Sequence, residues 1–267
     1  MITDILIAFS VVTAVGLISG ILLALASHFL HVPENERVKK LRECLPGVNC
    51  GACGYTGCDE YAKALDEGNV KTNLCIPGAD KTAADIAAVL GVEAEDVIEM
   101  VAYVHCNGNC NATDCKAKYS GVDTCRGASM LYGGPAACRF GCLGCGDCAA
   151  ECPVNAICIE DGIAHVNPNI CIGCGLCAET CPKKIISLMP QVSTTAVMCS
   201  SQDKGAVARK ACTNACIGCK KCELNCPHDA IKVENNLAKI DYSKCTGCGK
   251  CVEVCPTHCI KSVKVSA

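Results

Sequence analysis

One spacing of cysteines occurs four times in this 267-residue chain, and each copy ends at a proline. The spacing is Cys-x2-Cys-x2-Cys-x3-Cys-Pro, and the stretch CLGCGDCAAECP, which starts at Cys142, shows it in full. Three thiolates at such intervals bind one iron–sulfur cube from a tight loop, and the fourth, before proline, points to another cube. Zinc is the alternative, because paired Cys-x2-Cys motifs also form tetrahedral sites, but zinc has no use for the fixed third and fourth cysteines. The spacing therefore predicts [4Fe-4S] centres.

The four copies form two pairs, which indicates an internal duplication. The copies at Cys142 and Cys171 recur at Cys216 and Cys245, each 74 residues later. Within each pair the two copies start 29 residues apart (142 to 171 and 216 to 245). The predicted ligands of these motifs are Cys142, Cys145, Cys148, Cys152, Cys171, Cys174, Cys177, Cys181, Cys216, Cys219, Cys222, Cys226, Cys245, Cys248, Cys251 and Cys255.

Each pair of motifs resembles the bacterial two-cluster ferredoxin. The resemblance implies that the fourth cysteines cross over, so that Cys181 completes the motif at Cys142 and Cys152 completes the motif at Cys171. Cys255 and Cys226 take the same roles in the second module. The β-prone stretches IAHVN and LAKID fit the small ferredoxin sheet, and short helices are expected at CAETC and CVEVC. Metal binding would supply much of the folding free energy of such small units.

Another group of four cysteines precedes the duplicated modules. The stretch LPGVNCGACGYTGC places Cys50, Cys53 and Cys58 on a glycine-rich loop before a helix, and Cys75 follows. The glycines allow the backbone to fold closely around a bulky inorganic core. The group resembles the cluster domain of the B subunits of Rnf membrane complexes and of corrinoid iron–sulfur proteins. The segment ADKTAADIAAVLGVEAEDVIE after it predicts two short helices broken at Gly91, with Asp80 or Thr82 capping the first.

Several cysteines outside these motifs are tentative ligands. Four of them fall in the stretch 101–137 with no regular spacing, and they are enough for a sixth cluster by number, although structural thiols are the alternative. Two others lie four residues ahead of their modules and are 74 residues apart, so they could displace a neighbour such as Cys145 or Cys219. The six are Cys106, Cys110, Cys115, Cys125, Cys138 and Cys212.

Four further cysteines have less defined roles. Cys199 follows Cys125 by the same 74 residues, and the roles of both stay open. Cys44, Cys158 and Cys259 have no repeat partner, and we expect them to be buried thiols. None of the six histidines lies in a paired motif of the Rieske type, so they are interpreted as ordinary surface or interface residues.

The N-terminal segment predicts a membrane anchor. The stretch from Ile5 to Pro33 holds 29 residues without Asp, Glu, Lys or Arg, more than the ~20 needed to span a bilayer. Met1 to Asp4 carries no positive charge, which favours an anchor over a cleaved signal peptide despite the small residues Ala24-Leu25-Ala26. Four basic residues follow the span between 37 and 42, so the N-terminus is expected outside and the cluster domains in the cytoplasm, where thiols stay reduced.

Composition and missing motifs exclude several classes of function. The net charge is −3 and no basic tract is present, which speaks against nucleic-acid binding. No Gly-x-Gly-x2-Gly fingerprint follows a predicted strand, so dinucleotide binding is unsupported. No catalytic constellation can be picked out among cysteines that are so densely shared by metal motifs. Many redox centres without a catalytic site indicate electron transfer.

The order of the segments resembles the B subunit of Rnf complexes over essentially the whole chain. This resemblance implies a polyferredoxin subunit in the bacterial or archaeal plasma membrane that accepts electrons from reduced soluble ferredoxin. It would pass them into a ferredoxin:NAD oxidoreductase that transports Na+ or H+, whose membrane and flavin-bearing subunits hold the nicotinamide site and the ion path. The expected cofactors are five [4Fe-4S] clusters, with a sixth possible. The alternative is a tethered ferredoxin-like carrier for a hydrogenase or another reductase, without ion transport.

These observations predict an α+β chain with one transmembrane helix, a four-cysteine domain and two ferredoxin modules. A basic patch formed by residues around the motif at Cys216 is either a ferredoxin-docking surface or an ordinary solvated face. The patch comprises Lys204, Arg209, Lys210, Lys220 and Lys221. The expected domains are the anchor at 1–33, the four-cysteine domain with its helical spacer at 34–100, a cysteine-rich linker at 101–137, and ferredoxin modules at 138–190 and 191–267.

Overall fold

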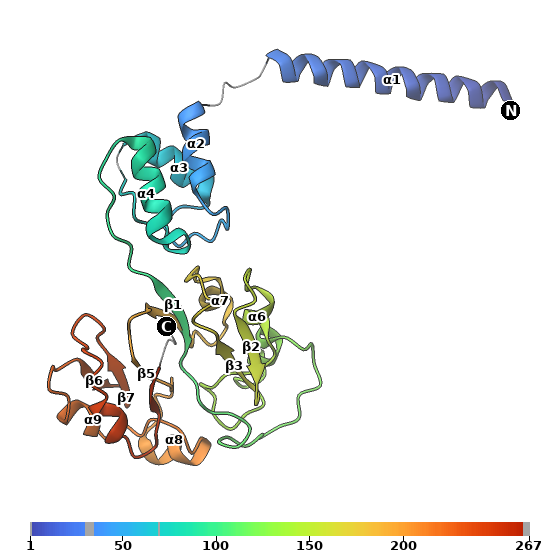
Figure 1. Ribbon diagram of the computed structural model, residues 1–267. Helices are drawn as coiled ribbons and strands as arrows, with labels where there is room; N and C mark the ends of the chain where they lie inside the picture. The colour runs from blue at the N-terminus through green and yellow to red at the C-terminus, as the bar shows by residue number, and fades with distance from the viewer. Residues whose placement is uncertain (1, 30–34, 69, 264–267) are drawn as a thin grey trace.

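The computed structural model describes residues 2–29, 35–68 and 70–263. Helix α1 (Ile2–Phe29) stands apart from the cysteine-bearing domains (Figure 1). Its segment Phe9–Ala26 has a mean hydropathy of 2.3 and is entirely exposed, and α1 is the one described helix long and apolar enough to cross a membrane. The hydroxyl groups of Ser10 and Thr13 donate to backbone carbonyls one turn earlier, which satisfies them inside the helix. The expected end of the anchor at residue 33 lies outside the described residues.

A small helical domain follows, built from α2 (Glu36–Cys44), α3 (Cys58–Asp66) and α4 (Ala79–Leu90), with a short 3-10 helix at Ile76–Gly78. The three α-helices pack around one apolar centre whose largest side chains are almost fully buried, because each helix turns one apolar stripe inward. Those side chains are Leu41, Tyr61, Leu65 and Ile86.

The prediction of a second helix after Gly91 is wrong. Gly91 ends α4 in the left-handed conformation, and residues 92–99 form no regular element. Neither predicted side chain caps α4, whose N-cap is Gly78. The carboxylate of Asp80 instead accepts a hydrogen bond of 2.8 Å from the backbone N–H of Val97. This contact holds the extended segment against the helical domain.

Each ferredoxin module consists of two antiparallel strand pairs and three short helices. In the first module β1 (Met100–Val104) pairs with β4 (Ile186–Pro190), and β2 (Ile157–Glu160) pairs with β3 (Ile163–Val166). In the second module β5 (Thr195–Val197) pairs with β8 (Ile260–Ser262), and β6 (Ile231–Glu234) pairs with β7 (Leu237–Ile240). The predicted strands at IAHVN and LAKID are thus confirmed as β3 and β7. The short helices are α5 (Cys125–Met130), α6 (Asp147–Ala150), α7 (Leu176–Thr180), α8 (Gly205–Ala211), α9 (Lys221–Leu224) and α10 (Lys250–Glu253).

The first strand of each module is separated from its first motif by an insert. These inserts are residues 105–141 in the first module and 198–215 in the second, and they carry α5 and α8. Strand β1 falls almost wholly in the stretch expected to be a linker, yet Met100 pairs with Pro190 and Val104 with Ile186. The strand pairing therefore joins 100–104 to the module expected at 138–190.

The two modules pack against each other through their outer strands (Figure 1). Val101, Met189 and Ala196 are buried together at this contact. His105 connects the two sides, because its Nδ1 lies 2.7 Å from the Val197 carbonyl oxygen and its Nε2 lies 2.5 Å from Ser187 Oγ. The two modules consequently pack against each other through a common interface.

Candidate metal centres

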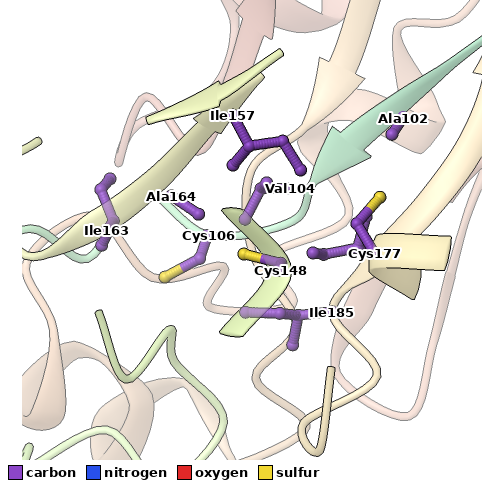
Figure 2. Packing of buried hydrophobic residues seen from close by; sticks show 10 residues of the cluster. Ala102, Val104, Cys106, Cys148, Ile157, Ile163, Ala164, Cys177 and Ile185 are labelled. Atoms are coloured by element: carbon purple, nitrogen blue, oxygen red, sulfur yellow. The ribbon is translucent and has the colours of Figure 1, made fainter. Parts of the chain in front are cut away.

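Cysteine sulfur forms part of the core of the first module. Figure 2 shows the thiols of Cys106, Cys148 and Cys177 among Val104, Ile157 and other aliphatic side chains. With no Trp and three Phe in the chain, these modules have few large side chains with which to fill a core. Thiol-lined cavities take the place that aromatic packing fills in other small domains.

The four cysteines of the helical domain are brought together, as expected. Cys58 begins α3, its backbone N–H donates to Asn49 Oδ1 over 2.9 Å, and its thiol lies near that of Cys75 together with Cys50 and Cys53. Burial raises the pKa of Cys75 to about 11, and the neighbouring thiols act in the same direction. The loop reaches this arrangement because Gly51 and Gly54 adopt φ values of +73° and +88°, which side chains other than glycine disfavour.

The second motif of the first module gathers with the fourth cysteine of the first motif, as the crossing pattern implies. Burial raises the pKa of Cys177 to about 11, and the neighbouring thiols of Cys171, Cys174 and Cys152 act in the same direction. Backbone N–H groups point at the thiols, with Ala102 N 3.4 Å from Cys171 Sγ and Ala156 N 3.3 Å from Cys152 Sγ. Cys50 of the helical domain is one of the thiols that raise the pKa of Cys174, after burial, which is the main cause. The thiol group of the helical domain therefore lies next to the group at Cys171.

The first motif of the first module contains a fifth thiol that the spacing did not single out. Cys142, Cys148 and Cys181 line a cavity with about 340 Å³ of open space, and Cys125 from α5 lines it with them. Cys145 is not among the lining residues, and its thiol points toward the Leu143 carbonyl at 3.7 Å. Two backbone N–H groups at the start of α5, those of residues 125 and 126, donate to the carboxylate of Asp147 over 2.9 and 3.2 Å. These bonds fix α5 against the motif.

The first motif of the second module also has five thiols. Cys216, Cys219, Cys222 and Cys255 line one cavity, and Cys259 lines it as well, with its sulfur 3.6 Å from that of Cys255. Hydrogen bonds from the Cys259 thiol lower the pKa of Cys255 to about 4 and that of Cys216 to about 6.

The three cysteines predicted to be buried thiols have different environments. Cys259 is buried, as predicted. The prediction is wrong for Cys158, which is exposed on β2 beside Glu160, and Cys44 is only half-buried at the end of α2. Alternation along the half-exposed strand β2 turns Cys158 to solvent.

The second motif of the second module forms a fifth group. Cys245, Cys248 and Cys251 line a cavity together with Cys226 from the preceding motif, which is the crossing that the ferredoxin resemblance implies. The N–H of Ala230 lies 3.4 Å from Cys226 Sγ, the same contact that Ala156 makes with Cys152 in the first module.

The four cysteines of the stretch 101–137 do not form one group. Cys125 joins the motif at Cys142, whereas Cys106 lies in a different cavity with Cys138, Cys199 and Cys212. The other two, Cys110 and Cys115, are exposed. Sequence spacing could not separate these roles, because one insert carries all four cysteines and places Cys106 and Cys125 in different cavities.

The thiol groups fit iron–sulfur clusters better than single metal ions. In residues 2–29, 35–68 and 70–263, no three His, Cys, Asp or Glu side chains are close enough together to hold one ion. Thiols around a cube stand farther apart, because iron and sulfide lie between them. Backbone N–H groups directed at sulfur are a further feature of such sites, where hydrogen bonds to sulfur set the reduction potential.

Family models place iron–sulfur domains along the same parts of the chain. A model described as an Fe-S cluster matches residues 45–77. Three models described as 4Fe-4S dicluster domains match residues 141–185, 170–231 and 206–262. The helical domain and both modules are therefore iron–sulfur domains by sequence as well as by geometry.

Several curated proteins are similar over most of their length. The B subunit of the Na(+)-translocating ferredoxin:NAD(+) oxidoreductase complex of Acetobacterium woodii is 45% identical over 97% of this chain and 78% of its own. The chain belongs to this family of B subunits. Two further members are the proton-translocating counterpart of Clostridium ljungdahlii, 46% identical over 87% of this chain and 83% of its own, and the B subunit of the ion-translocating oxidoreductase complex of Methanosarcina acetivorans, 36% identical over 89% and 90%. Membership of this family confirms the resemblance found in the sequence.

Proposed function

We propose that this chain is the electron-transfer subunit of an ion-translocating ferredoxin:NAD oxidoreductase complex. The observation that carries the proposal is the succession of five separate groups of cysteine thiols along one chain of this family. [4Fe-4S] clusters bound at these groups would supply one-electron acceptors and donors. The chain itself binds and orients the cofactors and shields them from water, while the nicotinamide chemistry belongs to partner subunits.

The ligands proposed for five clusters follow the thiol groups described above. The helical domain contributes one group and each module contributes two, with the fourth cysteines exchanged between motifs. For the motif at Cys142 we propose Cys125 as the fourth ligand in place of Cys145, because Cys125 lines the cavity and Cys145 does not. We place the start of the first module at β1, so that the module covers residues 100–190 with the former linker as its insert. The remaining proposed ligands are Cys50, Cys53, Cys58, Cys75, Cys142, Cys148, Cys152, Cys171, Cys174, Cys177, Cys181, Cys216, Cys219, Cys222, Cys226, Cys245, Cys248, Cys251 and Cys255.

The chain is proposed to be anchored in the bacterial or archaeal plasma membrane by α1. A fully exposed apolar face around this helix needs lipid or another membrane helix to cover it. The basic residues of α2 lie directly after the anchor, which favours an external N-terminus and cytoplasmic cluster domains. The other membrane subunits and the flavin-bearing subunits would then meet the chain near this anchor.

Soluble ferredoxin is proposed to dock on the basic patch of the second module. All five of its basic side chains are exposed, and none of them forms an ion pair with a described residue. Lys220 and Lys221 adjoin Cys219, a motif cysteine that is itself exposed. An acidic partner attracted to this patch would therefore approach the thiol group at Cys216 closely.

Charge reversal of Lys220 and Lys221 tests this docking site. We expect the variant Lys220→Glu/Lys221→Glu to slow electron entry from reduced ferredoxin about tenfold at low ionic strength, because steering by opposite charge is lost. The difference should shrink as salt is added, since salt screens exposed charges. The measurement is stopped-flow bleaching of the iron–sulfur absorbance after mixing with reduced ferredoxin.

The matched control is Lys118→Glu/Lys232→Glu, which makes the same change in net charge at two exposed lysines outside the patch. Its rate should stay close to that of the unmodified protein. Equal rates for all three proteins at low salt would remove this patch as the docking site, while leaving the assignment of the clusters intact.

A further inference from the structure

Cys255, the proposed fourth ligand of the group at Cys216, has two side-chain hydrogen-bond partners. Its sulfur lies 3.8 Å from Thr257 Oγ1 and 3.6 Å from Cys259 Sγ. Both partners line the same cavity as the motif thiols. Thr257 is 8% exposed and Cys259 is 2% exposed, so water has little access to either contact. Hydrogen bonds in such a shielded place are stronger than those made in water.

The other three motifs carry no comparable pair of side chains at these positions. Thr257 and Cys259 are the second and fourth residues after the last cysteine of their motif. Lys183 is the counterpart of Thr257 by the 74-residue repeat, and its Nζ donates instead to the carbonyl groups of Gly133 and Arg139. The donor pair is therefore a property of one motif and not of the duplication. The residues at the two positions in the other motifs are Val154 and Ala156, Lys183 and Ile185, and His228 and Ala230.

Binding of a cluster would fix the direction of both hydrogen bonds. A cysteine binds cluster iron as a thiolate, which has no proton and can only accept. The Thr257 hydroxyl and the Cys259 thiol would then both donate to Cys255 Sγ. Hydrogen bonds to an ionised acceptor are about twice as strong as those between neutral groups. The ligand sulfur is thus placed where two buried donors can stabilise negative charge on it.

Donors at a ligand sulfur favour the reduced form of a cluster. Reduction adds one electron from an external donor such as reduced ferredoxin, with no bond broken and no proton transferred. Part of the added charge falls on the ligand sulfur atoms, so a donated hydrogen bond stabilises the reduced form more than the oxidised form and raises the reduction potential. Lys220 and Lys221 line the same cavity, and their positive charges act in the same direction.

We propose that Thr257 and Cys259 are positioning residues that raise the reduction potential of the cluster at Cys216. Cys259 acts as a hydrogen-bond donor and not as a ligand, because Cys216, Cys219, Cys222 and Cys255 already supply one thiolate for each of four iron atoms. The inference rests on the proposed function, since it needs a cluster at this motif. It gives the motif beside the basic patch a built-in preference for holding an incoming electron.

Redox titration followed by low-temperature EPR tests the proposal on the full chain, purified anaerobically in detergent. The variants Thr257→Val and Cys259→Ala each remove one donor, and alanine is the residue at the equivalent position of two other motifs. We expect each variant to keep its full iron content. The equilibrium constant for reduction of one cluster should fall about tenfold, which corresponds to about 59 mV for one electron. The other clusters should titrate as in the unmodified protein.

Conservative variants and a matched control separate hydrogen bonding from packing. Thr257→Ser and Cys259→Ser keep a donor, so their titrations should stay close to that of the unmodified protein. Cys158→Ala removes an exposed thiol on β2 and should leave every potential unchanged.

Three results would overturn the proposal. The first is an unchanged titration of Thr257→Val and Cys259→Ala with full iron content. The second is a serine variant that shifts as far as its partner without a donor, which would indicate packing alone. The third is a loss of about four iron atoms in Cys259→Ala, because Cys259 would then be a ligand. An unmodified chain without iron at its motifs would contradict the proposed function as well, so iron content distinguishes the two failures.

Discussion

At the residue scale, Cys125 and Cys145 compete for one ligand position. Cys125 lines the cavity with Cys142, Cys148 and Cys181, whereas Cys145 points toward a backbone carbonyl. We expect Cys125→Ser to lower the iron content by about four per chain, and Cys145→Ser to leave it unchanged. Iron analysis with low-temperature EPR of the reduced proteins makes this comparison. If instead Cys145→Ser lost iron and Cys125→Ser did not, Cys145 would be the fourth ligand, as the regular motif spacing predicts.

The grouping of most motif cysteines could be predicted from the sequence, whereas the grouping of the insert cysteines could not, for a structural reason. The regular spacing implied that Cys152 crosses to the motif of Cys177, and the structure places these two thiols near each other. The 74-residue offset equates Cys125 with Cys199, but these two thiols line different cavities. The two inserts differ in length, so the 74-residue offset no longer identifies equivalent cysteines within them. Equivalent cysteines are instead those at the same distance from the first strand of each module, such as Cys106 and Cys199.

At the element scale, the motif loops pack against hairpin turns through glycines. Gly144 has a φ of +73°, and a Cβ there would lie 2.5 Å from the carbonyl oxygen of Gly162 in the β2–β3 turn. Gly249 has a similar φ of +75°, but a Cβ there would meet no atom within 4 Å. A side chain would be strained by the positive φ at both positions, but only at Gly144 would it also collide with neighbouring backbone.

Substitution of these two glycines separates strain from overlap. We expect Gly249→Ala to lower the free energy of unfolding by about 1–2 kcal/mol, the cost of the left-handed conformation for a residue with a side chain. Gly144→Ala should cost clearly more, because the methyl group also overlaps backbone that cannot move freely. Anaerobic thermal unfolding of the cluster-loaded proteins measures the difference. Equal losses of unfolding free energy in the two variants would contradict this expectation, because the β2–β3 hairpin would then move aside for the methyl group without a measurable cost.

The elements themselves were predictable to different degrees. Strands β3 and β7 alternate clearly and are found where expected, as is the apolar helix α1. The role of β1 was missed, because its partner β4 lies more than eighty residues later and nothing local indicates the pairing. The stretch after Gly91 looked helical by composition, but the contact of Asp80 with the Val97 N–H holds it extended.

At the scale of the whole molecule, the anchor is separate from the cluster-bearing part. No side chain of the segment Phe9–Ala26 is buried against the rest of the chain, so α1 adds nothing to the packing of the domains. We expect a chain that begins at Asn35 to stay in solution without detergent and to keep its full iron content. The full chain should sediment with membranes. Ultracentrifugation followed by iron analysis checks both, and loss of iron on truncation would contradict the separation.

The interface between the modules has an evolutionary consequence. A gene duplication ordinarily doubles what the ancestor already had. Here each copy supplies only half of the thiols around the shared cavity, so one module alone has an incomplete set. The cavity therefore exists only where two copies meet, and the halves cannot be separated without destroying it.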